Sequence, residues 1–535
     1  MNMKRTIALI FAIVMTMALV ACGGSPAAGS SSGSVSGSGF GSVSGSGGTD
    51  LTDDSKTYKK EVTVGLWQAI DQLDPCTETG NTADTVYQII YNRLVGFNWD
   101  TQEAIPELAE SWEIENSSSY VFNLRKGVKF SNGEEMTADD IVFTFAERPT
   151  NVTGTTGSAV WNKIESIEVV NDYCVRFKLN TPDADFLYRL YIAYFGVMNR
   201  EACEKDPEKG HLIGTNGWIV DSFSPNESVS FTRFDDSWVW KENGLNPTEE
   251  LIFRFITEDT TRSIALQKGE VAADTSLNFA SLTALAGDEN VNTLTYNSES
   301  LTYVIFNMAT GKLANDANLR KAVAYALDYD ELVEIGTNGL GERAISYWGK
   351  SQYGLYEDFD EEYVHNVEKA KELLTAAGYP NGLEINLVTR PTEEALAPLV
   401  QAQLKEAGIK VNITATDSAG ASAIVKSGEF DMMFYGISLQ SIGDRFAFVP
   451  NINHSTNRAK YDNPEMMAKF TAALGETDDA KRKAIYKEIQ IEMHDQIPYL
   501  PLYYDTWSVG YYDGVSGIQW TPNNKYDFTF TRWEE

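Results

Sequence analysis

From about residue 58 to its end, the chain alternates short apolar runs with longer amphipathic stretches. Residues 120–124 place apolar side chains at every second position, which predicts a strand, and residues 62–67 (VTVGLW) read as a first strand. Thr137 is followed three residues later by Asp140 and then by an apolar run. This pattern is typical of a capping box, and it predicts that a helix begins there.

The second half of the chain predicts a regular succession of elements. Residues 318–335 carry apolar side chains at helical spacing and predict one amphipathic helix. Another helix is predicted over 367–378, where Gly378 and Pro380 end it. A strand over 383–388, a helix over 393–407 and a strand over 409–414 follow. Because strands and helices alternate, we expect a mostly parallel sheet with helices on its faces.

The N-terminus predicts export and a lipid anchor. Lys4 and Arg5 precede an uncharged apolar run over residues 7–20, and the sequence Leu-Val-Ala-Cys ends at Cys22. This ending resembles a bacterial lipobox, which implies a signal peptide over 1–21 and a lipidated Cys22 at the outer face of the cell membrane. The alternatives are a plain signal peptide with a chance cysteine and a membrane anchor, although the run is shorter than the roughly 20 residues that span a bilayer. The Gly/Ser-rich residues 22–57 predict a flexible tether.

Length and charge narrow the class of protein. A chain of 535 residues is too long for one core, so two or three domains are expected. The net charge of −33 argues against nucleic-acid binding and against lying on an anionic membrane surface.

The cysteines and histidines predict no cofactor. Besides Cys22, the cysteines are Cys76, Cys174 and Cys203, which do not suggest a disulfide framework, although one bridge such as Cys174–Cys203 stays open. The four histidines form no metal-ligand motif, and no nucleophile motif indicates an enzyme. We therefore expect no cofactor, no metal and no catalytic residue.

Eight short segments, which occur in order along the chain, resemble the family 5 extracellular solute-binding proteins, the peptide-, nickel- and opine-type receptors of ABC importers. They are residues 73–75 (LDP), 105–112 (IPELAESW), 120–130 (YVFNLRKGVKF), 137–143 (TADDIVF), 214–218 (GTNGW), 318–328 (NLRKAVAYALD), 376–380 (AAGYP) and 497–503 (IPYLPLY).

The resemblance implies an α/β fold, a two-lobed periplasmic-binding-protein-like clamshell with an extra subdomain in the discontinuous first lobe. Two crossing strands would join the lobes, and ligand would bind between them. The expected divisions are a first lobe over 58–97, 210–295 and 505–535, an extra subdomain over 98–209, and a second lobe over 296–504.

The resemblance also nominates ligand-binding residues. Peptide-binding members hold the ligand amine with an Asp in a Gly-Trp-x-x-Asp-like stretch, and residues 435–446 correspond to it, with Gln440 at the place of that Asp. Arg390 matches an Arg that pairs with the ligand carboxylate, although it could instead pair with Glu393. The remaining candidates are Asp444, Arg445 and Phe446 in the same stretch, and the aromatic residues Trp67 and Trp348 as cleft walls, each of which could instead pack between the lobes.

The resemblance implies a monomeric, lipid-anchored receptor that delivers an oligopeptide or peptide-like solute to a membrane permease. Because Gln440 cannot neutralise an ammonium group, simple dipeptide binding is in doubt. The alternatives are a sugar, opine or metal-chelate ligand, a signalling or adhesion lipoprotein without transport, and an extracellular hydrolase.

Overall fold

The structure is a computed structural model that describes residues 56–535, except residues 100, 154, 156, 246, 361, 439–442, 455 and 522. The predicted signal peptide, Cys22, nearly all of the predicted tether and Gln440 lie outside the described residues. Within the described part of the chain, no helix is both long enough and apolar enough to span a membrane.

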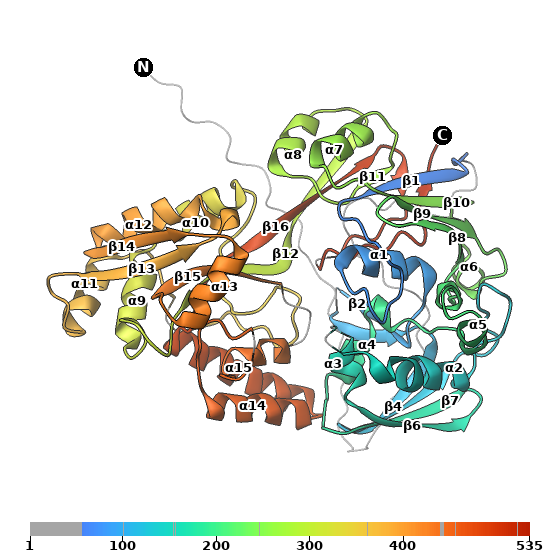
Figure 1. Cartoon of the computed structure of the whole chain (residues 1–535), viewed down its shortest axis with the longest axis horizontal. Coiled ribbons are helices and arrows are strands. Elements are labelled where there is room, and N and C mark those ends of the chain that lie inside the picture. Colours follow the sequence, from blue (N-terminus) through green and yellow to red (C-terminus); the bar gives the residue numbers. More distant parts are fainter. Residues whose placement is uncertain are drawn as a thin grey trace, which may run out of the picture. The chain divides into compact units, whose positions relative to one another are not determined.

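A ten-stranded mixed sheet is the largest element of the structure (Figure 1). In spatial order, its strands are β14 (Ile409–Ala415), β13 (Leu383–Thr389), β15 (Met432–Ser438), β12 (Val291–Phe306), β16 (Tyr499–Tyr512), β11 (Ala273–Asp274), β1 (Glu61–Leu66), β10 (Glu250–Phe255), β9 (Ser228–Arg233) and β8 (Trp218–Ser224).

The expectation of a mostly parallel sheet is only partly correct. β14, β13 and β15 pair in parallel, as the strand–helix–strand pattern predicts, and β1 pairs in parallel with β10 and β11. The other pairs are antiparallel, because β12 and β16 run in opposite directions through the middle of the sheet and β8, β9 and β10 form a meander. Only strand pairs with crossover helices are parallel here.

β12 and β16 are the two long strands that connect the groups of elements at either end of the sheet (Figure 1). They pair along most of their length, and β12 bulges between Asn297 and Leu301, opposite Tyr504–Thr506 of β16. A bulge bends the strand and increases its local twist. We call β12 and β16 the hinge strands.

Both parallel sets of strands point their carboxyl ends at this bulge. Ser438, at the end of β15, pairs with Ser300 of β12 beside the bulge, and β13 runs parallel to β15. From the other side, β11 runs antiparallel to β16 toward the bulge, and β1 runs parallel to β11. The loops that follow β1, β13 and β15 therefore converge on the hinge strands.

A separate four-stranded antiparallel sheet has the order β4 (Ala109–Asn116), β5 (Ser119–Leu124), β7 (Cys174–Leu179), β6 (Ile164–Asn171). Two short pairs complete the strands: β2 (Val95–Asn98) with β3 (Glu103–Pro106), and β17 (Val515–Ser516) with β18 (Arg532–Trp533). The predicted strands over 62–67 and 120–124 correspond to β1 and β5.

The α-helices described are α1 (Asn81–Ile90), α2 (Ala138–Val142), α3 (Ser158–Trp161), α4 (Phe186–Leu190), α5 (Arg200–Lys205), α6 (Trp238–Asn243), α7 (Asp259–Gln267), α8 (Phe279–Leu285), α9 (Ala317–Ala326), α10 (Tyr329–Thr337), α11 (Val367–Ala376), α12 (Leu396–Glu406), α13 (Ser418–Ser427), α14 (Pro464–Gly475) and α15 (Asp479–Gln496). The capping box of Thr137 and Asp140 is present at the start of α2.

The single helix expected over 318–335 is wrong. It divides into α9 and α10 at Asp328, whose carboxylate accepts hydrogen bonds from the backbone N–H groups of Asp330 and Glu331 and so caps α10. The helix expected to begin at Glu393 also begins later, because Pro391–Glu393 form a 3-10 turn before α12. A possible Cys174–Cys203 bridge is not formed, since Cys76, Cys174 and Cys203 are all buried free thiols.

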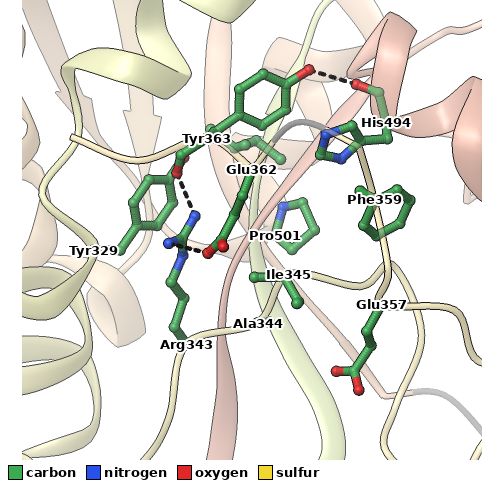
Figure 2. Close-up of a pocket in the computed structure, with 11 residues that line it drawn as sticks. Tyr329, Arg343, Ala344, Ile345, Glu357, Phe359, Glu362, Tyr363, His494 and Pro501 are labelled. Atoms are coloured by element: carbon green, nitrogen blue, oxygen red, sulfur yellow. Dashed lines mark hydrogen bonds and ion pairs between the residues drawn. The ribbon is translucent and has the colours of Figure 1, made fainter. Parts of the chain in front are cut away.

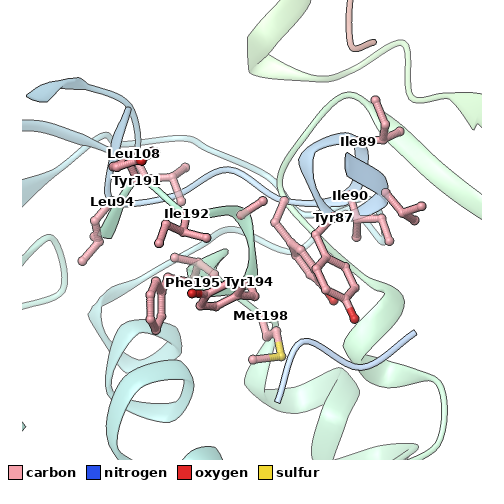
Figure 3. Close-up of a cluster of buried hydrophobic side chains, with 14 of the residues drawn as sticks. Tyr87, Ile89, Ile90, Leu94, Leu108, Tyr191, Ile192, Tyr194, Phe195 and Met198 are labelled. Atoms are coloured by element: carbon pink, nitrogen blue, oxygen red, sulfur yellow. The ribbon is translucent and has the colours of Figure 1, made fainter. Parts of the chain in front are cut away.

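Buried side chains form a large core around the four-stranded sheet and β1, and further cores on the two faces of the β13–β15–β12 region. In the first of these, Tyr87 and Ile90 of α1 lie beside Tyr194, Phe195 and Met198 (Figure 3). On β15 the side chains alternate: Met432 and Phe434 enter one core, and Met433 and Ile437 enter the other. This part of the sheet is therefore covered on both faces, which leaves its carboxyl edge for a site.

Candidate functional site between the strand ends

On the β1 side of the hinge strands, the site is lined by a pair of indoles. Trp67 follows β1, and its ring meets that of Trp507 of β16 edge to face, with 5.5 Å between ring centroids. Thr275, just after β11, holds both residues: its side-chain hydroxyl accepts from the backbone N–H of Trp67 at 3.2 Å, and its backbone carbonyl accepts from Trp507 Nε1 at 2.9 Å. Both rings stay partly exposed, as a cleft wall requires.

Asp505 lies two residues before Trp507, opposite the bulge of β12. The hydroxyl of Thr302 on β12 donates to its Oδ1 at 2.8 Å, and no basic side chain among the described residues pairs with it. The pKa of Asp505 is raised to about 6, because burial and, to a smaller extent, the negative charge of Glu393 raise it by more than the Thr302 hydroxyl lowers it. Asp505 is therefore a partly buried, uncompensated carboxylate at the hinge.

Arg390, at the carboxyl end of β13, pairs with Glu393. Its Nη2 contacts Glu393 Oε1, and its Nε donates to Glu393 Oε2 at 3.3 Å. The Glu393 side chain is only 7% exposed, so its charge has to be compensated, and Arg390 provides the compensation. Of the two roles that the sequence left open for Arg390, the structure shows the pairing with Glu393.

Tyr435 of β15 lies near Arg390 and near a second arginine, Arg458. The guanidinium carbon of Arg390 is 5.8 Å from the ring centroid, and that of Arg458 is 5.3 Å from it. Arg458 Nη1 donates to the hydroxyl of Ser422 on α13 at 3.3 Å. The carboxyl edge of the second-lobe strands thus presents two guanidinium groups around one aromatic ring.

The other predicted site residues fall in different surroundings. Trp348 is fully buried in a core and meets Tyr486 edge to face at 5.2 Å, while Phe446 is fully buried against Tyr303 and Tyr499. The backbone of Asp444 and Arg445 lies in the 3-10 turn Gly443–Phe448. The structure thus places Trp67 and Arg390 each just after a strand whose carboxyl end points at the hinge strands, whereas Trp348 and Phe446 are packed inside.

Sequence reasoning missed Trp507, Asp505, Tyr435 and Arg458. One signal was present: Asp505 interrupts the otherwise apolar run of β16, where a carboxylate is unexpected. Arg458 lies in a polar segment without periodicity, and no feature of the sequence distinguishes it.

Two cavities lie elsewhere, among the elements from β12 onward. One of about 50 Å³ is lined by Arg343, which pairs with Glu362 at 2.7 Å, and by the ring of His494, which stacks between Phe359 and Tyr363 (Figure 2). It has room for a water molecule or two and is too small for a peptide.

The other cavity has a volume of about 460 Å³, and its lining includes Met308, Arg320 and Tyr461. It lies beyond the end of β12 that is farther from the hinge bulge. Neither cavity includes the residues at the strand ends. In the described residues, no group of three His, Cys, Asp or Glu side chains could hold a metal ion.

Comparison with known proteins identifies the family. Residues 103–460, more than half of the chain, match the Bacterial extracellular solute-binding proteins, family 5 Middle. The chain belongs to this family. Its fold is accordingly the two-lobed α/β clamshell of periplasmic binding proteins, and it is an extracellular solute-binding protein of the kind that serves ABC transporters.

Individual relatives agree with this assignment. The chain is 28% identical to "Heme-binding protein A" of Haemophilus influenzae over 461 residues, which cover 79% of this chain and 83% of that protein. It is 28% identical to the "Dipeptide-binding protein" of Escherichia coli over 489 residues, 84% of this chain and 90% of that one. The structure of HbpA2 from Haemophilus parasuis matches with a TM-score of 0.79 and 25% identity, over 88% of this chain and 99% of that chain.

Proposed function

We propose that the protein captures an oligopeptide or peptide-like solute between its lobes and delivers it to an ABC permease in the membrane. The observation that carries the proposal is the convergence of the β1, β13 and β15 carboxyl ends on the hinge strands, because open α/β sheets bind ligands at such ends. The similarity to the Escherichia coli dipeptide-binding protein supports the peptide class.

The side chains at this place suit a peptide. The partly exposed rings of Trp67, Trp507 and Tyr435 offer apolar contact, and the carboxylate of Asp505 can accept from an amine or an amide N–H. Arg390 stays in the proposal as part of the wall, with its charge compensated by Glu393. In this role the protein breaks no bond, so it needs no catalytic residue and no cofactor.

The experiment for ligand class is mass spectrometry of the small molecules released on denaturing purified protein. We expect peptides, and calorimetry with the same synthetic peptides should give saturable binding to refolded, ligand-free protein. Ligand should also raise the melting temperature, because it binds only the native state. Release of sugars, opines or metal chelates, without any peptide, would reject the peptide proposal while leaving the receptor assignment intact.

We further propose that Cys22 is the mature N-terminus, carries lipid and tethers a monomeric receptor at the outer face of the cell membrane. The spacing of Lys4, Arg5, the apolar run and Cys22 supports this proposal. Cys22→Ser should move the protein from the membrane fraction to the medium or periplasm. A substituted protein that stays in the membrane after a salt wash would show that another anchor is present.

A further inference from the structure

Eleven of the fifteen arginines whose side chains the structure describes pair with a carboxylate. Of the other four, Arg254 is exposed on β10, and the guanidinium carbon of Arg532 lies 5.1 Å from the centroid of the Tyr58 ring. With 76 acidic and 43 basic residues, partners are plentiful. Ion pairs to Asp or Glu are formed by Arg93, Arg125, Arg148, Arg176, Arg189, Arg200, Arg233, Arg262, Arg343, Arg390 and Arg482. An arginine at the candidate site that lacks such a partner is therefore an exception that calls for an explanation.

Arg458 is this exception. Among the described residues it pairs with no carboxylate, and its only hydrogen bond is the one from Nη1 to the Ser422 hydroxyl at 3.3 Å. Its Nε is buried and has no acceptor in the described part of the chain. The guanidinium of Arg320 also lacks a carboxylate, but it donates to the carbonyls of Leu313, Ala314 and Gln496 and so is satisfied within the fold.

Arg458 lies close to the predicted carboxylate partner, Arg390. Since their guanidinium carbons are 5.3 and 5.8 Å from the same Tyr435 ring centroid, the two carbons are at most about 11 Å apart, the sum of these distances. Glu393 compensates the charge of Arg390 and leaves that of Arg458 uncompensated. A ligand anion that reaches this ring therefore gains more from Arg458 than from Arg390.

We propose that Arg458, held against Tyr435, binds a carboxylate of the ligand and sets a preference for ligands that carry one. This inference rests on the proposed peptide-receptor function and deepens it. A guanidinium presents a planar fork of N–H donors that matches a carboxylate, and the nearby ring of Tyr435 restricts where that fork can lie.

The test uses two pools of synthetic di- to pentapeptides, one with free C-terminal carboxylates and one with the same peptides amidated. Each pool is offered to ligand-free wild type, Arg458→Gln, Arg458→Met and Arg390→Gln, and retained peptides are measured by mass spectrometry and their Kd by calorimetry. Melting temperatures without peptide check that each variant is folded. The amidated pool includes peptides with Asp or Glu side chains, so a side-chain carboxylate is distinguished from a terminal one.

We expect wild type to bind carboxylate-bearing peptides about 10- to 100-fold more tightly than peptides without a carboxylate, a difference of roughly 1.4 kcal/mol per factor of ten. Arg458→Gln and Arg458→Met should lose most of this preference, whereas Arg390→Gln tests the competing assignment of the ligand carboxylate to Arg390. If either folded Arg458 variant keeps the full preference, or if only Arg390→Gln loses it, the inference is wrong and the peptide-receptor function stands. If wild type retains neither pool, the proposed function fails, and the inference fails with it.

Discussion

Two of the contacts that connect the elements before β12 to those after it differ in kind. One is the pair of hinge strands, β12 and β16, which hydrogen-bond along most of their length and belong to both groups of elements. The other is a side-chain contact between residues 184–185, just before α4, and the helices α14 and α15. In it, Arg482 Nη1 pairs with Asp185 Oδ1 at 3.0 Å and donates to the Ala184 carbonyl at 2.9 Å.

The second contact is buried and well satisfied. Asp185 is fully buried and the Arg482 side chain is 7% exposed. The Tyr486 hydroxyl donates to Asp185 Oδ2 at 3.0 Å, and the Ala184 N–H donates to the Leu474 carbonyl at 2.7 Å. The Asp185 carboxylate raises the pKa of the Arg482 guanidinium, in spite of its burial. We call this group of residues the Asp185–Arg482 contact.

The hinge strands are a permanent connection, whereas the Asp185–Arg482 contact depends on the conformation of the protein. The hinge strands persist whether the lobes are open or closed, since breaking them would unfold the sheet. The Asp185–Arg482 contact exists only where the two regions touch, and a buried ion pair is stable only while both partners stay together. In a clamshell receptor, such a contact contributes to the free-energy difference between closed and open forms, which the ligand also biases.

The largest effect should come from breaking the Asp185–Arg482 contact. Arg482→Met leaves Asp185 buried with its compensating charge removed, which should lower the free energy of unfolding by about 3–5 kcal/mol. Urea unfolding measures any loss of stability. Small-angle scattering measures the radius of gyration, which should increase if the lobes separate instead.

The matched control is the double variant Asp185→Leu/Arg482→Met. Because it removes both charges, it should recover most of the loss, and the coupling from the double-mutant cycle should exceed about 1 kcal/mol. If the effects of Asp185→Leu alone and Arg482→Met alone simply add up to that of the double variant, the two residues do not stabilise each other and the contact contributes little to stability.

The parts of the structure that depend on neighbouring residues were predictable from sequence. The strand β5 follows from its period of two, and the capping box of Thr137 and Asp140 from its spacing. The pairing of Arg390 with Glu393 could also be anticipated, since the two are three residues apart. The break between α9 and α10 was missed because the apolar periodicity continues across Asp328, while the cap acts only on the backbone.

The parts of the site that depend on strand register were not predictable. Thr302 and Asp505 are 203 residues apart and meet only because β12 and β16 pair in one register with a bulge. Arg458 likewise reaches Tyr435 from a different segment, and nothing local to either residue indicates that contact. The sequence therefore indicated which strand ends bear the site and left its uncompensated charges unidentified.

A smaller effect, with a pH dependence, should come from Asp505 on the hinge strands. Because folding raises the pKa of this carboxyl to about 6, the folded state binds its proton more tightly than the unfolded chain, and the charged form costs stability above pH 6. Asp505→Asn should therefore raise the free energy of unfolding by about 1–2 kcal/mol at pH 7.5, a value reduced for partial exposure. This gain should fade as the pH falls through 6 and vanish below about 4, the ordinary pKa of an aspartate, where the wild-type carboxyl is protonated in both states.

Urea unfolding at pH 4.5, 6.0 and 7.5 checks this prediction, with Thr302→Val as the companion variant. Removing the Thr302 hydroxyl takes away the one hydrogen bond that favours the charged form, so Thr302→Val should destabilise most at pH 7.5 and least at pH 4.5. A pH-independent effect of Asp505→Asn would mean that the carboxylate is well solvated at the hinge.

The smallest effect should come from the indole pair on the same strand. Trp507→Phe keeps an aromatic ring against Trp67 but removes the Nε1 donor that bonds the Thr275 carbonyl at 2.9 Å. We expect the free energy of unfolding to fall by about 1 kcal/mol, the typical net value of one such hydrogen bond. Trp67→Phe is the matched control, since the hydrogen bond at that position comes from the backbone N–H and survives the substitution, so it should cost less. If the two variants lose the same free energy of unfolding, ring packing accounts for the stability of this end of the hinge strands. The hydrogen bond to the Thr275 carbonyl would then contribute nothing measurable to holding β16 beside β11.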